Sequence, residues 1–181
     1  NFSLARGVRG TQFAGGPDAF FNQGSASISQ FRLTDVTLSG GLGTIFQISA
    51  SGLLRLERVV ARGTGGRTAR GSLTAAGPGP AAIQIVDSEF TDTRGSLTLN
   101  ASSNASGGAI VVSGSRFLRG RAGVSGAGLR ISADVGGVVM SLSGNRFEDN
   151  FGTNGAGLEL QFSGTSTVST ADMNGNVFRG N

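Results

Sequence analysis

VSGSRFLRG, at Val112–Gly120, is one of seven copies of a nine-residue pattern that decides the fold of this chain. The pattern places two apolar residues five positions apart, with small residues between them and glycine or asparagine at its end. The other copies are VRGTQFAGG from Val8, FRLTDVTLS from Phe31, LRLERVVAR from Leu54, IVDSEFTDT from Ile85, LSGNRFEDN from Leu142 and MNGNVFRGN from Met173. The second apolar residue of each copy is Phe13, Val36, Val59, Phe90, Phe117, Phe147 and Phe178, at steps of 23, 23, 31, 27, 30 and 31 residues. A motif that returns every ~20–50 residues is typical of a solenoid.

Each repeat has the pattern of short β-strands. Apolar residues alternate with period two in AIVVSGS, GLRISAD and GLELQFSG, and glycine-rich or asparagine-rich turns separate these segments. A second strand per coil is indicated by Leu97 and Leu99, by Leu129 and Ile131, and by Leu158 and Leu160. We therefore predict an all-β fold, a right-handed parallel β-helix of about seven coils. Residues 1–181 are expected to form a single segment, less regular over 1–80 and more regular over 81–181, and to be an internal part of a longer solenoid.

Stacked coils would bring equivalent residues to about 4.8 Å from one another. Two positions before the second apolar residue, the copies carry Thr11, Thr34, Glu57, Ser88, Ser115, Asn145 and Asn176. Three positions after it, they carry Gly16, Ser39, Arg62, Thr93, Gly120, Asn150 and Asn181. Short polar side chains can turn the chain and form hydrogen bonds with equivalent residues on adjacent coils. We predict asparagine ladder steps between Asn145 and Asn176 and between Asn150 and Asn181.

Charged residues also recur at fixed positions of the pattern. The position before the second apolar residue reads Gln12, Asp35, Arg58, Glu89, Arg116, Arg146 and Val177. Two positions after it, Asp92, Arg119 and Asp149 follow one another, one residue per coil. We predict that these three residues form a polar face on which opposite charges of neighbouring coils attract.

The residue types of the chain limit its chemistry. All 15 basic residues are arginine, and histidine, lysine, cysteine, tryptophan and tyrosine do not occur. The sequence therefore excludes a Ser-His-Asp triad, a thiol nucleophile, a P-loop lysine and a cysteine or histidine zinc site. We expect no cofactor, and no nucleic-acid partner because the phenylalanines fall mainly at core positions. No run of eighteen apolar residues occurs, so no transmembrane helix is expected.

Polysaccharide cleavage remains as an enzymatic alternative. Asp92, Arg119 and Asp149 are its best candidates, with Glu148 beside them. Two coil steps would separate the carboxylates by about 9–10 Å, near the upper edge of the ~6.5–9.5 Å of an inverting pair. The favoured interpretation is a charge ladder in which Arg119 neutralises the two acids.

Three sequons, at Asn1, Asn100 and Asn104, favour secretion and mark possible glycosylation sites. The last two are expected in the polar loop LNASSNASGG.

The later repeats carry the motifs of a known family. GGAI at 107–110, with GAGL at 126–129 and 155–158, alternates with FEDN at 147–150 and FRGN at 178–181. These motifs resemble the GGA[ILV] and FxxN repeats of the chlamydial polymorphic outer-membrane autotransporters, and those of right-handed parallel β-helix proteins of the pectate-lyase superfold. The first resemblance implies a surface-exposed passenger used in adhesion, and the second a fold that often cleaves polysaccharides.

We expect a non-enzymatic structural or adhesive segment of a secreted or cell-surface β-helical protein. The alternative is a fragment of a polysaccharide lyase or hydrolase with its active residues on other coils. The expected location is extracellular or the cell surface. The expected partners are further coils of the same chain or end-to-end copies, and cell-surface glycans or proteins.

Overall fold

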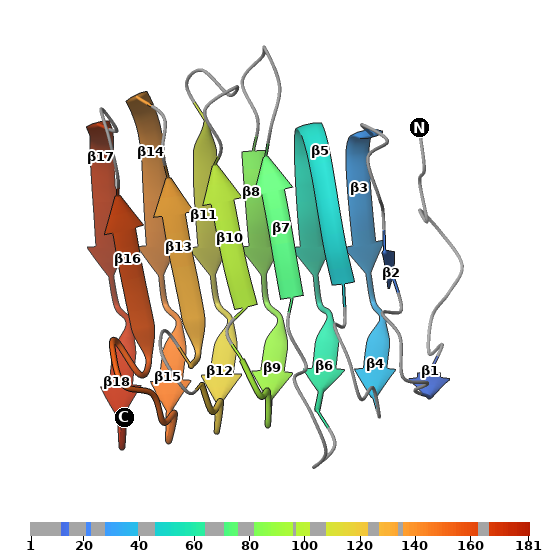
Figure 1. Ribbon diagram of the computed structural model, residues 1–181, viewed down its shortest axis with the longest axis vertical. Helices are drawn as coiled ribbons and strands as arrows, with labels where there is room; N and C mark the ends of the chain where they lie inside the picture. The colour runs from blue at the N-terminus through green and yellow to red at the C-terminus, as the bar shows by residue number, and fades with distance from the viewer. Residues whose placement is uncertain are drawn as a thin grey trace.

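The computed structural model describes residues 12–14, 21–22, 28–39, 46–63, 71–75, 82–95, 97–101, 108–122, 127–133, 136–162 and 167–181. Within these ranges the regular structure is β-strand, and the strands pair in parallel to form a solenoid. Figure 1 shows the strands as successive rungs between the two ends of the chain. The predicted all-β, parallel β-helical fold is confirmed, and the handedness of the coil stays a prediction.

One sheet consists of seven short strands, each contributed by a successive turn of the chain. Its order along the solenoid is β1-β4-β6-β9-β12-β15-β18, so chain order and spatial order agree (Figure 1). These strands are β1 (Gln12–Ala14), β4 (Thr37–Ser39), β6 (Val60–Arg62), β9 (Glu89–Thr91), β12 (Arg116–Leu118), β15 (Arg146–Glu148) and β18 (Val177–Arg179). Below, it is called the short sheet.

The remaining strands form two walls that one long strand joins. The first half of β5 (Phe46–Glu57) pairs with β2 and β7, and its second half pairs with β3 and β8. One wall holds β2 (Phe21–Asn22), β7 (Gly71–Ala75), β10 (Leu97–Ala101), β13 (Leu129–Ala133) and β16 (Leu158–Phe162). The other holds β3 (Ile28–Thr34), β8 (Ala82–Val86), β11 (Ala109–Ser113), β14 (Gly136–Ser143) and β17 (Thr167–Asn174). Each regular coil therefore has three sides around a common interior.

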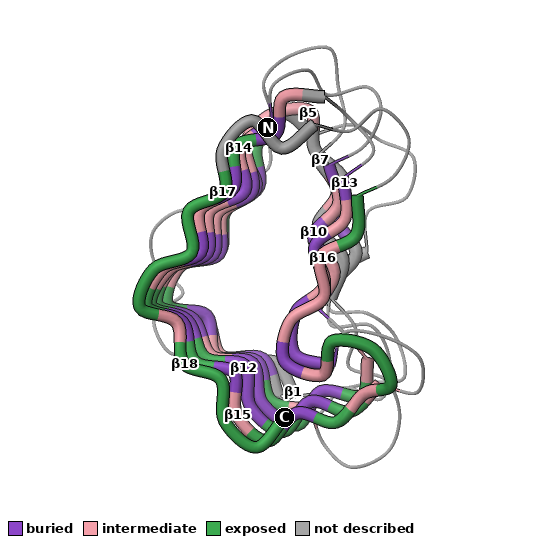
Figure 2. The backbone as a smooth tube through the Cα atoms, turned by 90° about the vertical axis from the view of Figure 1, so that its left-hand side faces the viewer, coloured by how far each residue is buried: buried purple, intermediate pink, exposed green. Residues whose placement is uncertain are grey.

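The interior is built from side chains that stack in register along the solenoid. In the wall that contains β11, one column consists of Leu33, Leu56, Ile85, Val112 and Leu142, and all five are buried. In the opposite wall, Leu97, Leu129 and Leu158 form one column and Leu99, Ile131 and Leu160 another, as the sequence predicts. Figure 2 shows the buried positions lining the inner side of the tube in successive coils. Because side chains alternate between the two faces of a strand, every second residue joins this core.

Phenylalanine rings fill the core under the short sheet. Phe90, Phe117, Phe147 and Phe178 lie in successive coils, and their centroids are 5.3, 5.0 and 4.7 Å apart. The ring planes are inclined by only 7–8° to one another. Aromatic pairs of this kind contribute about 0.5–1.5 kcal/mol beyond the area they bury.

Two tight corners enclose the short sheet, and both use left-handed backbone. The corner before the sheet, called the first corner below, is occupied by Asp35, Arg58, Asp87, Gly114, Gly144 and Gly175, with φ between 47° and 63°. The corner after the sheet, called the second corner below, is occupied by Asp92, Arg119, Asp149 and Gly180, with φ between 52° and 64°. Glycine adopts this conformation without strain, and aspartate is among the side chains that tolerate it best. A single left-handed residue turns the chain from one side of the coil to the next.

A hydrogen-bond ladder runs along the solenoid at both corners, from Val59 to Asn176 at the first and from Gly120 to Asn181 at the second. At the first corner, Val59 N–H donates to Ser88 Oγ at 3.1 Å, and Ser88 N–H donates to Ser115 Oγ at 3.1 Å. Ser115 N–H donates to Asn145 Oδ1 and Asn145 N–H to Asn176 Oδ1, both at 3.0 Å. At the second corner, Gly120 N–H donates to Asn150 Oδ1 at 2.8 Å and Asn150 N–H to Asn181 Oδ1 at 3.0 Å. The ladder thus gives these backbone donors partners inside an apolar coil.

The sequence alignment of the second and third copies was wrong by two residues. The short sheet pairs Phe90 with Ala61, Ala61 with Leu38 and Leu38 with Phe13, so neither Val36 nor Val59 is the equivalent of Phe90. Val59 instead precedes Ser88 in the ladder, and Thr34 and Glu57 end strands β3 and β5. A shift of two residues keeps every side chain on the same face of a strand, so alternation alone could not expose the error.

The charge columns change with this alignment. Glu89, Arg116, Arg146 and Val177 do share one column of the short sheet, but Asp35 and Arg58 belong to the first corner. Thr11 and Gly16 lie outside the described residues.

Replacing Asn145 with alanine tests the ladder. Asn145 is fully buried, accepts from Ser115 N–H and donates from Nδ2 to Val112 O at 2.8 Å. Each of these two orphaned buried groups costs about 1–3 kcal/mol, so we expect Asn145→Ala to lower the free energy of unfolding by about 2–6 kcal/mol. Urea denaturation followed by circular dichroism measures this change. The matched control is Asn176→Ala, which should cost less because Asn176 is only half-buried and water can replace its bonds. Equal stability of Asn145→Ala and the wild type would contradict the ladder.

Gly120 and Gly144 offer a second matched pair. A Cβ on Gly120 would lie 2.2 Å from the backbone oxygen of Ala127, whereas a Cβ on Gly144 would meet no atom closer than 4.0 Å. Gly144→Ala should therefore cost only the left-handed strain of about 1–2 kcal/mol. Gly120→Ala forces backbone to move and should cost about 3 kcal/mol or more. If Gly144→Ala lowered the urea midpoint more than Gly120→Ala, the close approach of Gly120 to the backbone of Ala127 would be contradicted.

Candidate functional site

The polar face predicted from Asp92, Arg119 and Asp149 lies at the second corner, one residue per coil. Arg119 forks onto Asp92, with Nε to Oδ1 at 2.8 Å and Nη2 to Oδ2 at 2.9 Å. The hydrogen bonds and the charge of Asp92 raise the pKa of Arg119, and the charges of Glu89 and Asp149 add to this effect. Glu148 is engaged elsewhere, since its Oε1 accepts from Nη2 of Arg146 at 2.7 Å. The three residues are thus neighbours, but only one pair is joined by hydrogen bonds.

The first corner carries the same arrangement. Its successive residues are Asp35, Arg58, Asp87 and Gly114, which match Asp92, Arg119, Asp149 and Gly180 of the second corner. Arg58 forks onto Asp35, with Nε to Oδ1 at 2.5 Å and Nη2 to Oδ2 at 2.9 Å. Because the same Asp-Arg-Asp-Gly order occurs at both corners, we interpret it as a device for stacking left-handed residues. The sequence alignment had placed Asp35 and Arg58 in the column of Glu89, so it did not show that the two corners share this order of residues.

The glycine at the fourth position of each Asp-Arg-Asp-Gly order is required for steric reasons. A Cβ on Gly114 would lie 2.3 Å from Oδ1 of Asp87, and a Cβ on Gly180 would lie 2.3 Å from Oδ1 of Asp149. The carboxylate of one coil therefore occupies the space that a side chain on the next coil would need. Glycine is the residue that combines this close approach with a positive φ.

The ion pair also determines the protonation of Asp92. The hydrogen bonds from Arg119 lower the pKa of Asp92 below its ordinary value, and the charges of Arg119 and Arg121 act in the same direction. An acid held ionised in this way is unsuited to the proton-donor role that an inverting pair of carboxylates requires at neutral pH. The lowered pKa leaves the base role open to Asp92, and its bidentate pairing with Arg119 is the contact that the charge-ladder interpretation predicts.

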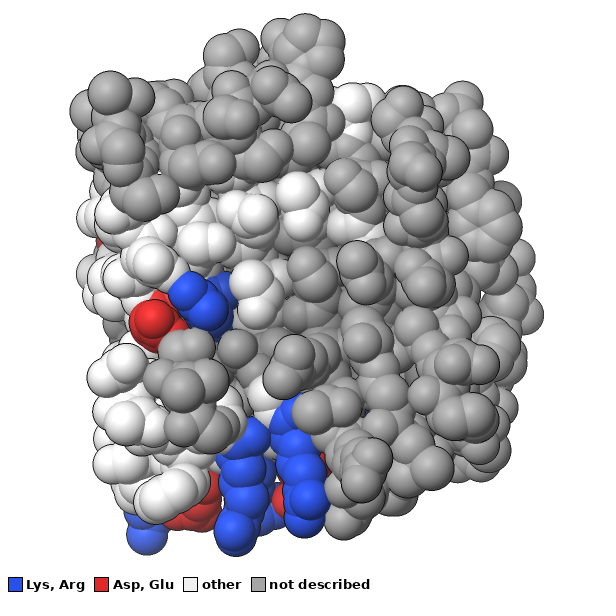
Figure 3. Space-filling model, in the orientation of Figure 1, with Lys and Arg blue, Asp and Glu red and all other residues white. Residues whose placement is uncertain are grey.

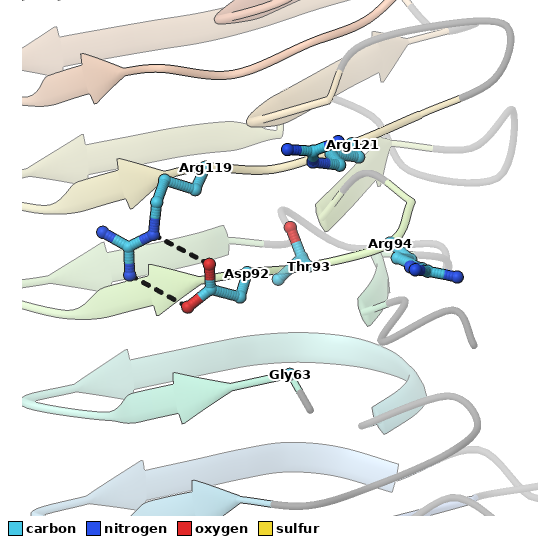
Figure 4. A pocket seen from close by; sticks show the side chains of 6 residues that line it. All are labelled: Gly63, Asp92, Thr93, Arg94, Arg119 and Arg121. Carbon is cyan, nitrogen blue, oxygen red and sulfur yellow. Dashed lines mark hydrogen bonds and ion pairs between the residues drawn. The ribbon is translucent and has the colours of Figure 1, made fainter. Parts of the chain in front are cut away.

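A hollow of about 260 Å³ opens beside this pair. The described residues that line it are Gly63, Asp92, Thr93, Arg94, Arg119 and Arg121. Figure 4 shows Asp92 and Arg119 facing each other at one end, Arg94 and Arg121 toward the other, and Thr93 between them. Figure 3 shows arginine side chains gathered at the edge of the molecule where the short sheet lies. We call these six residues the arginine hollow.

The backbone sets the spacing of Arg94 and Arg121. Parallel bridges join Arg94 to Arg121 and Arg121 to Phe151, so the three residues form one column on neighbouring coils. Arg121 N–H donates to Thr93 O, and Gly95 N–H donates to Arg121 O, at 2.7 and 2.8 Å. The sequence analysis missed both arginines, although each lies four residues after a stacked phenylalanine, Phe90 or Phe117. That spacing was the available signal.

The predicted ladder residues lie at the two corners. Asn145 and Asn176 are joined by a bond from Nδ2 of Asn145 to Oδ1 of Asn176 at 3.0 Å, and Asn150 and Asn181 by the equivalent bond at 2.9 Å. The side-chain amides of Asn176 and Asn181 also bond to the backbone of the preceding coil. Asn176 Nδ2 donates to Leu142 O, and Asn181 Nδ2 donates to Phe147 O.

Of the three sequons, Asn100 is described and its expected place in a loop was wrong. Asn100 lies inside β10, between the buried residues Leu99 and Ala101, and its Oδ1 accepts from Ser132 Oγ at 3.2 Å. The inward alternation of Leu97, Leu99 and Ala101 carries the strand through Asn100. Asn1 and Asn104 lie outside the described residues.

Comparison of the chain with protein-family models, with characterised proteins and with solved structures finds no match. Among the described residues, no long apolar helix that could cross a membrane is found, and no group of three or more acidic residues is placed to hold a metal ion. The geometry of the solenoid therefore carries the functional interpretation.

Replacing Arg119 with glutamine tests the origin of the Asp92 pKa. We expect the pKa of Asp92 to rise toward its ordinary value in Arg119→Gln, as measured by carboxyl NMR during a pH titration. A smaller rise is expected in Arg121→Gln, because Arg121 acts on Asp92 only through its charge. Since the folded-state pKa is depressed, the pair stabilises the protein above the ordinary pKa of aspartate, and this contribution is lost as the pH falls through the folded-state value. An unchanged Asp92 pKa in Arg119→Gln would contradict the pairing.

Proposed function

We propose that this chain is a non-enzymatic, structural or adhesive segment of a secreted or cell-surface β-helical protein. The observation that carries the proposal is the Asp-Arg-Asp-Gly order at both corners of the coil. At the first corner these residues occupy the same turn of successive coils, and Arg58 donates two hydrogen bonds to Asp35 of the preceding coil. Asp92, Arg119 and Asp149 repeat that arrangement, so their geometry is explained by stacking.

The motifs that resemble autotransporter passengers support the same function. In FEDN and FRGN, the phenylalanine enters the ring stack and the asparagine, three residues later, enters the ladder. Both residues of the motif therefore bind one coil to the next. A long passenger built from such coils would hold its outer surface at a fixed distance from an anchor. We propose that this protein belongs with these right-handed β-helical surface proteins.

The proposed partners are further coils of the same chain or copies that stack end to end. Phe178 packs on Phe147 at 4.7 Å, yet about half of its surface, 51%, is exposed. Met173 and Val177 beside it are each 45% exposed. Another coil on this face would continue the ring stack and cover the apolar side chains.

Beads coated with the chain test the adhesive role. We expect these beads to remain on a surface that displays cell-surface polysaccharides, under flow that removes beads coated with the denatured chain. We also expect no new reducing ends and no unsaturated products when the chain is incubated with the same polysaccharides or with polygalacturonate. Denatured chain is the control for both readouts.

The two readouts separate the alternatives. Cleavage of a polysaccharide that Asp92→Asn and Asp149→Asn abolish would replace the structural proposal with the lyase or hydrolase alternative. Failure to remain on any of the surfaces would remove the adhesive role.

A further inference from the structure

The arginine hollow carries an excess of positive charge. Three arginines and one aspartate line it among the described residues, and Asp92 is already engaged with Arg119. The balance of the lining is therefore two positive charges, concentrated toward the end where Arg94 and Arg121 lie (Figure 4). Charge of one sign in a concave site raises the local concentration of counter-ions and focuses the field.

We propose that the arginine hollow binds a carboxylate or sulfate group of an acidic polysaccharide, an inference that rests on the adhesive role proposed above. A guanidinium group presents a planar fork of donors that matches both kinds of oxyanion. Arg94 and Arg121 bring two such groups to one column, with their backbones joined by a parallel bridge. The two backbones lie one strand spacing apart, about 4.8 Å, so the flexible side chains of Arg94 and Arg121 start close enough for both to reach one oxyanion.

The size and lining of the hollow favour an acidic sugar over a nucleotide. Its volume of about 260 Å³ is just below the ~300–1,000 Å³ of pockets that enclose whole drug-sized ligands, so it suits one charged unit of a longer polymer. Strong binders of single-stranded nucleic acid stack bases on aromatic rings. The six described lining residues are glycine, threonine, aspartate and arginine, which bind by charge and hydrogen bonds.

The rigid backbone beneath the hollow favours binding without rearrangement. Thr93 is buried at 5% exposure, and its carbonyl accepts from Arg121 N–H at 2.7 Å. Asp92 and Arg119 hold each other by two hydrogen bonds at the other end. A backbone that is already held in place adds little to the entropy lost when the ligand binds.

Fluorescence anisotropy with labelled oligosaccharides tests the inference on the full chain. The probes are a heparin oligosaccharide, which carries sulfate and carboxylate, an oligogalacturonate, which carries carboxylate alone, and a neutral dextran oligosaccharide. We expect binding of one or both acidic probes, weakening with salt, and no binding of dextran. Binding of heparin alone would assign sulfate, and binding of both would assign the carboxylate as sufficient.

Two double variants with equal loss of charge distinguish the hollow from the net charge. Arg94→Gln with Arg121→Gln should weaken binding of the acidic probe about tenfold or more. Arg116→Gln with Arg146→Gln removes two exposed arginines of the short sheet outside the hollow and should change the affinity by less than about threefold. Asp92→Asn should tighten binding, because it removes the negative charge of the lining. Thermal unfolding of each variant verifies that it is folded.

Several outcomes would overturn the inference. Equal losses in the two double variants would show that net charge alone attracts the probe, and unchanged binding in Arg94→Gln/Arg121→Gln would exclude the hollow. Competition by a single-stranded oligonucleotide as strong as by unlabelled heparin would overturn the assignment to glycans. Retention of coated beads on neutral polysaccharides without binding of acidic probes would sink this inference and leave the adhesive role intact.

Discussion

The later coils of this solenoid, from Val59 at the first corner and from Gly120 at the second, depend on one hydrogen bond at each corner. A left-handed residue turns the chain, and the next residue points its N–H along the solenoid axis, where a side-chain oxygen of the neighbouring coil accepts it. Without that acceptor the donor would be buried in an apolar coil, at a cost comparable to the contribution of several packed methyl groups. The stack of Phe90, Phe117 and Phe147 lies between the two ladders. Its close spacing follows from coils that the ladders hold in register.

How far the sequence could predict this structure depends on which residue occupies the ladder position. Where it is serine or asparagine, as at Ser88, Ser115 and Asn145, polar and apolar positions differ and the alignment is correct. At Val36 and Val59 an apolar residue takes that position, while Ala61 stands where Phe90 would. In these copies the nine-residue pattern matches equally well when it is shifted by two residues, so the correct alignment cannot be chosen from the pattern. Hydrophobic periodicity specifies which face a residue occupies, but not which of two equivalent positions it fills.

The candidate site shows the same limit for charged residues. Asp92, Arg119 and Asp149 could be aligned from the stacked phenylalanines, and their repetition in Asp35, Arg58 and Asp87 could not, because it required the corrected alignment. Arg94 and Arg121 lie two residues beyond Asp92 and Arg119, in the same register, and could have been aligned from the same phenylalanines. Their proximity to Asp92 follows from the turn itself. A set of charged residues that suggested catalysis in isolation has a second copy at the other corner, and stacking is what the two copies share.

The ladder also has a direction. The N–H of Val59 is accepted by Ser88, that of Ser88 by Ser115, and that of Ser115 by Asn145, so each acceptor lies 27 to 30 residues later in the chain. During synthesis from the N-terminus, a coil therefore emerges before the side chain that completes its corner has been made. The newest coil is always the unfinished one. Folding of such a chain is bound to trail its translation by one coil, and a pause in translation would leave the last corner waiting for its partner.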